Sequence, residues 1–187
     1  MIIALRHGHT AAPNAQHSPT GQVVNGGDKS VDLDAQGVQE VQEAALQICE
    51  YPVLEVRAAM AYKRDASSGH IVSQVCGVPL KDMPSLAPWD SGALTGQPLE
   101  AVWDVLSILM DIPTVAAPGG QAVGDWAAKW AQTFEQVYAE YGKDDSRAVV
   151  LIVHGMEMRA LPPLTGDGEF DKSQQQNVGP GDFVIIH

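Results

Sequence analysis

Two short apolar runs, one at the start of the chain and one near residue 150, each stop at a His-Gly pair. The first run, 2–5, leads into Arg6-His7-Gly8, and the second, 148–153, leads into His154-Gly155. A continuous apolar run bounded by glycine predicts a buried strand, and a strand covered on both faces need not alternate. The pattern therefore predicts two parallel strands that deliver one histidine each to the same edge of a sheet, where open α/β sheets bind ligands.

Between these runs, apolar residues recur at helical spacing and alternate with further strand-like segments. Asp34 is a candidate N-cap for the first helix. Strands that alternate with helical patterns are typical of the α/β class. We expect a single domain over residues 1–187, with a mostly parallel central sheet and helices on both faces in three layers. Strands are expected at 2–5, 53–62, 148–153 and 182–187, and helices at 33–50, 64–77, 99–110, 125–141 and 156–161.

Three stretches rich in glycine or proline, the polar stretch 9–32, the aromatic stretch 83–96 and the stretch 112–123, are predicted to be loops. A loop as long as the first one is usually functional when it lies inside a compact domain. Because it follows directly on a strand end, it could fold over a ligand site there.

Composition limits the partners. The chain has 187 residues, 45% of them hydrophobic and 18% charged, and a net charge of −12. This is ordinary for a globular domain, and the acidic balance argues against nucleic acid or an anionic membrane as a partner. No signal peptide or membrane-spanning run is apparent, so we expect a cytoplasmic location. Nothing indicates the oligomeric state, and a dimer is one possibility.

The two cysteines, Cys49 and Cys76, belong to no C-x-x-C pair or metal-ligand spacing. We expect both to be small buried apolar side chains. Only five arginines are present, at positions 6, 57, 64, 147 and 159. An acidic chain that gathers arginine at one site is expected to hold an anion there.

Arg6-His7-Gly8 followed by Thr10, an arginine at position 64, and His154-Gly155 after a late strand resemble, in this order, the histidine phosphatase superfamily, also called the phosphoglycerate mutase-like family. Residues 33–37 are similar to the segment that opens a helix in that family. The resemblance implies a phosphoglycerate mutase-like fold and phosphoryl transfer. In that reaction His7 would attack phosphorus while Arg6, Arg64 and His154 hold the phosphoryl oxygens.

The resemblance also implies further substrate contacts. Thr10 and Asn14 fall near positions where the family has a polar residue and an asparagine. Gln121 lies in a segment, 118–122, similar to a Gly-Gly-Glu-Ser sequence that borders the family's pocket, with glutamine in place of glutamate. We therefore expect Thr10, Asn14 and Gln121 to bind substrate.

The proton donor is the weakest match. Residues 89–96 resemble the family segment that carries a glutamate general acid, but Pro88 stands at the glutamate position. Asp90 is the nearby carboxylate, so it either donates the proton or is only a turn residue.

These residues predict hydrolysis of a small phosphomonoester through a phosphohistidine on His7, held in the reactive tautomer by a backbone carbonyl such as that of Gly8. No metal or other cofactor is expected, because two arginines and His154 supply the positive charge. The alternatives are a mutase that returns the phosphoryl group to its substrate, and a catalytically weak phosphate-binding protein. Structurally, the two histidines could instead be core residues, and Arg64 a surface arginine paired with Asp65.

Overall fold

The core of the protein is a sheet of five strands in the order β3-β2-β4-β1-β5. The computed structural model describes residues 1–11, 15–160 and 178–187. The central strands β1 (Ile2–Arg6) and β4 (Ala148–Val153) pair in parallel, and every residue of β4 is buried. This full burial explains why neither run alternates polar with apolar residues.

The outer strands complete a mixed sheet. Strand β2 (Val53–Ala58) pairs in parallel with β4 on one side and with the short β3 (Leu80–Asp82) on the other. Strand β5 (Phe183–Ile186) pairs antiparallel with β1. The strand expected at 53–62 is thus shorter and ends at Ala58. Strand β3 was not predicted from the sequence. Three residues are too few for a periodic signal.

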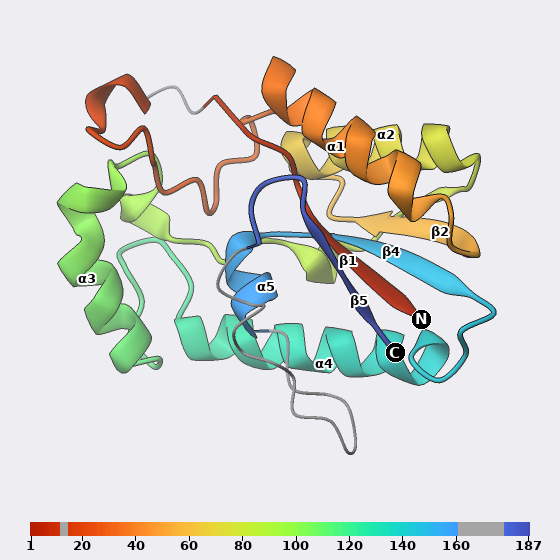
Figure 1. Cartoon of the computed structure of the whole chain (residues 1–187). Helices are drawn as coiled ribbons and strands as arrows, with labels where there is room; N and C mark the ends of the chain where they lie inside the picture. The colour runs from red at the N-terminus through yellow and green to blue at the C-terminus, as the bar shows by residue number, and fades with distance from the viewer. Residues whose placement is uncertain (12–14, 161–177) are drawn as a thin grey trace.

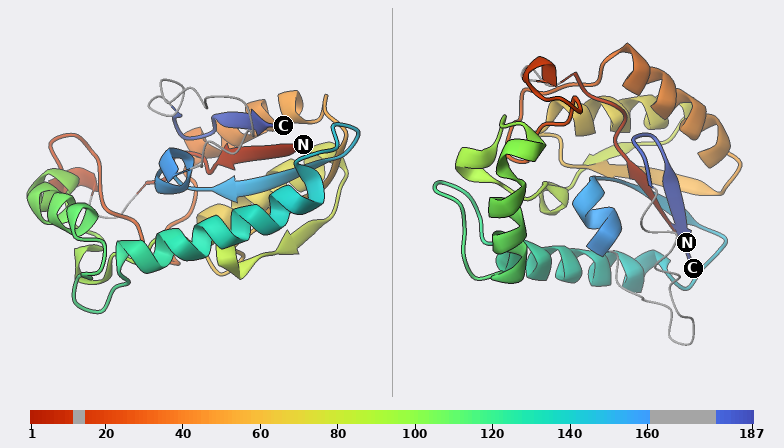
Figure 2. Two further views of the ribbon diagram at one scale, coloured as in Figure 1. Left: turned by 90° about the horizontal axis from the view of Figure 1, so that it is seen from below. Right: turned by 60° about the vertical axis from the view of Figure 1, so that its left-hand side comes forward.

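Helices cover both faces of the sheet (Figures 1 and 2). Helices α1 (Ala35–Ile48) and α2 (Lys63–Cys76) pack on one face, against Ile3, Val150 and Ile152 among others. Helix α4 (Val123–Tyr141) and the short α5 (Gly155–Ala160) lie on the other face. The three-layer α/β prediction is confirmed.

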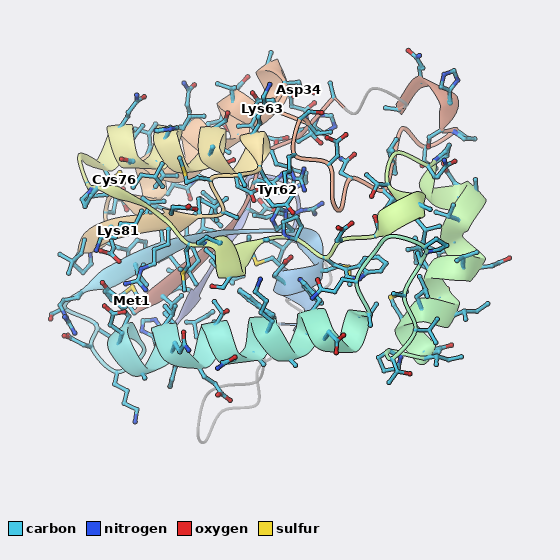
Figure 3. All side chains as sticks on the ribbon, turned by 180° about the vertical axis from the view of Figure 1, so that it is seen from behind. Met1, Asp34, Tyr62, Lys63, Cys76 and Lys81 are labelled. Carbon is cyan, nitrogen blue, oxygen red and sulfur yellow. A yellow bond between two sulfur atoms is a disulfide. The ribbon has the colours of Figure 1, made fainter. Side chains whose placement is uncertain are left out.

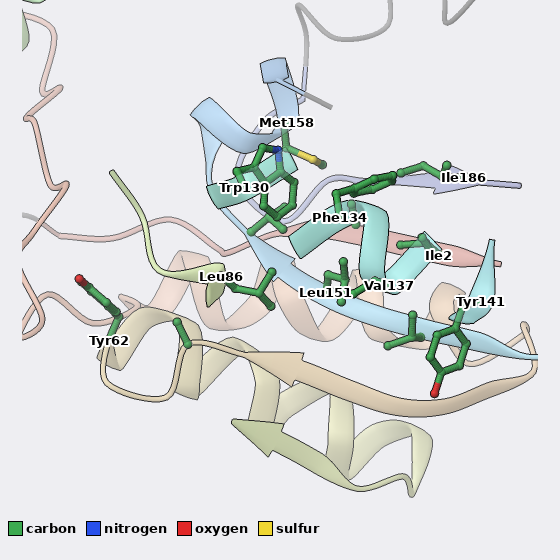
Figure 4. Packing of buried hydrophobic residues seen from close by; sticks show 14 residues of the cluster. Ile2, Tyr62, Leu86, Trp130, Phe134, Val137, Tyr141, Leu151, Met158 and Ile186 are labelled. Carbon is green, nitrogen blue, oxygen red and sulfur yellow. The ribbon is translucent and has the colours of Figure 1, made fainter. Parts of the chain in front are cut away.

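The face under α4 shows how the sequence pattern produces the packing. Trp130, Phe134, Val137 and Tyr141 recur every three or four residues along α4 and are all buried. They meet the β1 and β4 side chains that point to the same face, such as Leu151, as Figure 4 shows. Complete burial of one such side chain contributes about 1.5–3 kcal/mol.

A separate lobe stands beyond the carboxyl ends of the parallel strands (Figures 1 and 2). It consists of the described part of the loop after β1 with a short 3-10 turn (Ala15–His17), a further turn (Gly92–Leu94), and helix α3 (Leu99–Asp111). Another turn (Pro84–Leu86) packs instead against α4 and β4. The small core of the lobe contains Trp89, Leu106 and Trp126. The loop-like regions of the sequence therefore gather at the sheet edge where the histidines were expected.

Cys49 and Cys76 form a disulfide, so the prediction of two separate buried thiols was wrong. Cys49 caps the C-terminus of α1, and Cys76 is the last residue of α2, which packs beside α1. Figure 3 labels Cys76 at the end of α2 away from Tyr62. Two cysteines 27 positions apart carry no pairing signal in one sequence, because only helix packing brings them together. No helix in the described part of the chain has the length and apolar character needed to span a membrane.

Candidate active site

His7 lies just beyond the last residue of β1, and its backbone continues the sheet. Its amide donates to the carbonyl oxygen of Val153 at 3.0 Å. Its imidazole Nδ1 lies 2.9 Å from the carbonyl oxygen of Gly8. Only a protonated ring nitrogen can donate to a carbonyl, so Nδ1 carries the hydrogen and Nε2 keeps its lone pair. The expected contact with Gly8 is present.

The backbone of the turn at Gly8 packs directly against the start of α1, and this close approach fixes the turn that carries His7. A side chain on Gly8 would collide with the backbone of Gly37, and one on Gly37 would collide with His9. Asp34 is the N-cap of α1, as predicted, and accepts a hydrogen bond from the Gly37 amide at 2.9 Å. The segment 33–37 therefore matters here because it lets α1 begin directly against the turn that carries His7.

His154 follows β4 and lies beside His7. The two ring centroids are 5.0 Å apart, with an interplanar angle of 63°. Burial, reinforced by the neighbouring histidine, lowers the pKa of His7 to about 3. Burial also lowers the pKa of His154 to about 4. Both imidazoles are therefore neutral at neutral pH, and the predicted convergence of the two strand-end histidines is confirmed.

Arg6 lies at the end of β1 next to the turn after His154. Its Nη1 donates to the carbonyl oxygen of Val178 at 2.8 Å. Its guanidinium carbon is 3.4 Å from the position that a Cβ on Gly155 would occupy. This is an ordinary van der Waals distance, so the Arg6 guanidinium lies against the turn after His154.

Arg64 is in the first turn of α2 and is only 1% exposed, so the alternative of a surface arginine is wrong. Its Nη1 donates to the carbonyl oxygen of Asp28 at 2.7 Å and its Nη2 to that of Gly26 at 3.0 Å. Its Nε is 4.0 Å from Asp65 Oδ1. Arg64 therefore ties α2 to the loop after β1, a structural role that the sequence did not reveal.

Two buried carboxylates near the histidines were not predicted as site residues. Asp65 is fully buried, and its Oδ2 lies 3.1 Å from His154 Nε2. Glu157, on the first turn of α5, is 1% exposed and acts electrostatically on His154. The sequence positions of these two carboxylates could have indicated that they belong to the site. Asp65 directly follows Arg64, and Glu157 stands three residues after His154, on the same face of a helix.

Asp90 lies in the lobe, where its Oδ1 accepts a hydrogen bond from the Gly92 amide at 3.0 Å. It lines a pocket of about 380 Å³ together with Gly27, Asp28, Thr95 and others. A Cβ on Gly27 would collide with its carboxylate. The contact with Gly92 is that of a turn residue. The role of Asp90 as proton donor stays a prediction.

The remaining predicted substrate contacts are distributed around the lobe. Gln121 lies beside Asp90, because the backbone N–H of Gln121 donates to the backbone carbonyl oxygen of Asp90 at 2.9 Å. Thr10 Oγ1 accepts from Asn25 Nδ2 at 3.2 Å and so holds the loop after β1. Asn14 lies outside the described residues. Contact of any of the three with substrate stays a prediction.

Within residues 1–11, 15–160 and 178–187, no group of three or more His, Cys, Asp or Glu side chains is arranged to hold a metal ion.

Solved structures with this fold include both phosphatases and mutases. A mycobacterial glucosyl-3-phosphoglycerate phosphatase has a TM-score of 0.68 and 20% identity, over 87% of this chain and 77% of that one. A phosphoglycerate mutase from Bacillus anthracis has a TM-score of 0.72 and 17% identity, over 93% and 81%. A phosphoglycerate mutase from Thermus thermophilus has a TM-score of 0.66 and 18% identity, over 97% and 90%. The predicted phosphoglycerate mutase-like fold is confirmed.

A search of curated protein sequences found no match. The family comparison is more decisive, because it covers nearly the whole chain. The model of the histidine phosphatase superfamily (branch 1) matches residues 2–186. With His7 and His154 side by side at the carboxyl ends of β1 and β4, the chain belongs to the histidine phosphatase superfamily.

Proposed function

We propose that this protein hydrolyses small phosphomonoesters through a phosphohistidine formed on His7. The observation that carries the proposal is the 2.9 Å contact between His7 Nδ1 and the Gly8 carbonyl oxygen. It places the proton on Nδ1 and leaves the Nε2 lone pair for attack on phosphorus. The lowered pKa of His7, about 3, keeps that lone pair available at neutral pH.

The reaction then runs in two displacements. His7 Nε2 forms a bond to phosphorus while the ester P–O bond breaks, and the leaving alkoxide takes a proton. Water next attacks the phosphorus of the phosphohistidine, the P–N bond breaks, and inorganic phosphate leaves with the free imidazole. Splitting the reaction in this way replaces one difficult step by two easier ones.

Positive charge around His7 supports phosphoryl transfer, which depends mainly on positioning and electrostatic stabilisation. The guanidinium of Arg6 lies against the turn after His154, and Arg64 is buried in the first turn of α2. Guanidinium groups suit the phosphoryl oxygens because each can donate two parallel hydrogen bonds. His154 would add a further donor beside His7. No metal ion is part of the proposed mechanism.

A mutase uses the same groups and remains the first alternative, since both activities occur among the proteins of similar fold. The difference lies in the acceptor of the phosphoryl group, which is water in a phosphatase and the substrate in a mutase. Incubation with 3-phosphoglycerate separates them. Free phosphate supports the phosphatase, and 2-phosphoglycerate without free phosphate supports the mutase.

A catalytically weak phosphate-binding protein is the second alternative, and three observations favour it. The Asp90 carboxylate is engaged by the Gly92 amide, and Pro88 stands where the family carries its glutamate acid. Arg64 also directs two donors to backbone carbonyls. Such a protein would bind phosphate and cleave only esters with good leaving groups.

We extend the proposal to a small phosphorylated substrate and a cytoplasmic location. The first is supported by exclusion, since a net charge of −12 disfavours nucleic acid and anionic membranes as partners. The Cys49–Cys76 disulfide argues against the second, because disulfides are rare in the cytosol of most organisms.

The assay is hydrolysis of nitrophenyl phosphate without added metal, in the wild type and in His7→Ala. Turnover by the wild type and its loss in the variant support the proposal. Turnover that is unchanged in a correctly folded His7→Ala protein would contradict it. Arg147→Lys is the matched control, because Arg147 is a half-exposed residue paired with Asp144.

A further inference from the structure

Asp65 is fully buried between His154 and Arg64 at the candidate site. Its Oδ2 lies 3.1 Å from His154 Nε2, and its Oδ1 lies 4.0 Å from Arg64 Nε. Neither oxygen accepts a hydrogen bond from any residue that the structure describes. A buried carboxylate normally accepts several hydrogen bonds or a close bidentate pairing. Asp65 is therefore held in place by the fold without the hydrogen bonds that would stabilise its charge.

A second buried carboxylate stands close by. Glu157 is 1% exposed, and its two oxygens likewise lack a hydrogen-bond partner among the described residues. Burial raises the pKa of Glu157, and the negative charge of Asp65 raises it further. Two neighbouring carboxylates in a dry site resist simultaneous ionisation, so the pair favours a state that retains a proton.

The charged and titratable groups around Asp65 come from four places in the fold. They are His7 after β1, His154 after β4, Glu157 on α5, and Tyr62 and Arg64 at the start of α2. Tyr62 is labelled in Figure 3. The negative charge of an ionised Asp65 would repel an anionic ligand bound among these groups.

We propose that an anion binds at the His7–His154 site only together with a proton that is taken up by the Asp65 carboxylate. The inference rests on the proposed function in one respect, namely that the anion site is the one beside His7. The proton comes from solvent and forms an O–H bond on Asp65, and no other bond changes. The neutral acid then removes the repulsion toward the anion and can donate toward His154.

The position of the equilibrium supports this coupling. Burial, opposed by His7 and Arg64, raises the pKa of Asp65 to about 7. A bound anion adds negative charge beside the carboxyl and raises that pKa further. Above neutral pH, each bound anion must therefore bring in one proton, so affinity falls about tenfold per pH unit. Below neutral pH the carboxyl is already neutral, and affinity levels off.

Sulfate is the probe, because its own charge does not change from about pH 5 to about pH 9, whereas that of phosphate does. Isothermal titration in two buffers of different ionisation enthalpy gives both the dissociation constant and the number of protons taken up. For the wild type we expect a dissociation constant that rises about tenfold per pH unit above pH ~7. About one proton per sulfate should be taken up at the alkaline end.

Three variants assign the proton. Asp65→Asn should bind sulfate with a dissociation constant that is nearly independent of pH and with no proton uptake. Glu157→Gln should keep the pH dependence and the proton uptake, because the proton is taken up by Asp65. Asp104→Asn, which removes one exposed charge from α3, should behave as the wild type does.

Several results would overturn the inference. If the pH dependence is unchanged in Asp65→Asn, the proton is taken up by His154 and not by Asp65. If the dependence is lost only in Glu157→Gln, the proton is taken up by Glu157. Turnover of nitrophenyl phosphate with pH-independent sulfate binding would refute the coupling and leave the proposed function standing. Proton-coupled sulfate binding without any turnover would refute the proposed function and leave the coupling standing.

Discussion

Arg64 Nη1 donates a 2.7 Å hydrogen bond to the carbonyl oxygen of Asp28, and this contact joins the first turn of α2 to the loop after β1. A second bond, from Nη2 to Gly26, is 3.0 Å long. The same loop lies against Asp90, because a side chain on Gly27 would strike that carboxylate. One buried guanidinium thus connects the candidate phosphate site to the lobe that carries the candidate proton donor.

Arg64→Lys should damage both roles. A lysine keeps the charge, but it cannot reproduce a planar group that bonds two carbonyls at once. We expect kcat/KM for nitrophenyl phosphate to fall by about tenfold to a hundredfold, and the free energy of unfolding to fall by about 1–3 kcal/mol. Urea denaturation and steady-state kinetics measure the two effects. Arg57→Lys, at a partly buried ion pair with Glu55, is a control, and it should change stability without changing kcat/KM.

Asp65→Asn should make the protein more stable at alkaline pH. The folded-state pKa of Asp65 is raised, to about 7, above its value in the unfolded chain. The stability that this group contributes is therefore greatest in acid and is lost as the pH rises from about 4 to about 7, because the carboxyl ionises in the unfolded chain while the buried one keeps its proton. Above about pH 7 the buried carboxyl ionises too, and the loss levels off. Three pKa units correspond to about 4 kcal/mol, so the variant should gain on the order of 2–4 kcal/mol at pH ~8.

That gain should shrink as the pH falls through about 7 and vanish near about pH 4, where the wild-type carboxyl is neutral in both states. Urea denaturation at several pH values follows it. A gain of the same size at all pH values would mean that asparagine acts through packing and not through charge.

Asp90→Asn should distinguish a working enzyme from a weak one. If Asp90 protonates the leaving group, its removal should slow hydrolysis of alkyl phosphates by about 10²–10⁴-fold. Nitrophenyl phosphate should be affected much less, because nitrophenolate leaves without protonation. Equal effects on both substrates, or none, would leave Asp90 as the turn residue that its bond to Gly92 suggests.

Reduction of Cys49–Cys76 should lower stability without altering catalysis. The bond closes a loop with a sequence separation of 27 and joins the C-terminal ends of α1 and α2. We expect Cys49→Ala with Cys76→Ala to cost about 2–4 kcal/mol of unfolding free energy. The value of kcat should stay unchanged, because the site lies at the other end of α2.

The same cysteines test the proposed location. Rapid thiol alkylation of cells, followed by mass spectrometry, shows whether the bond exists where the protein resides. Reduced cysteines fit the cytoplasm, and a fully oxidised pair would contradict a reducing compartment.

The sequence predicted the elements that repeat a local pattern. The apolar runs before His7 and His154 identify β1 and β4, and the N-cap at Asp34 identifies the start of α1. Parallel strands end at the same edge, so the meeting of the two histidines also followed from local signals.

The sequence could not predict features that depend on tertiary packing. The disulfide requires α1 and α2 to lie side by side. Asp65 is a helix residue like any other until packing places it against His154. The hydrogen bonds of Arg64 go to backbone carbonyls, which every residue carries, so no pattern of side chains marks them.

The most direct test of the central claim is the position of the phosphoryl group during turnover. Wild-type protein is mixed with nitrophenyl phosphate, quenched in alkali, which preserves phosphohistidine, and digested for mass spectrometry. We expect one phosphoryl group on His7 in the wild type and none in His7→Ala, which should not turn over the substrate. Continued turnover with no phosphoryl group on His7, or with the group on another residue, would contradict the central claim.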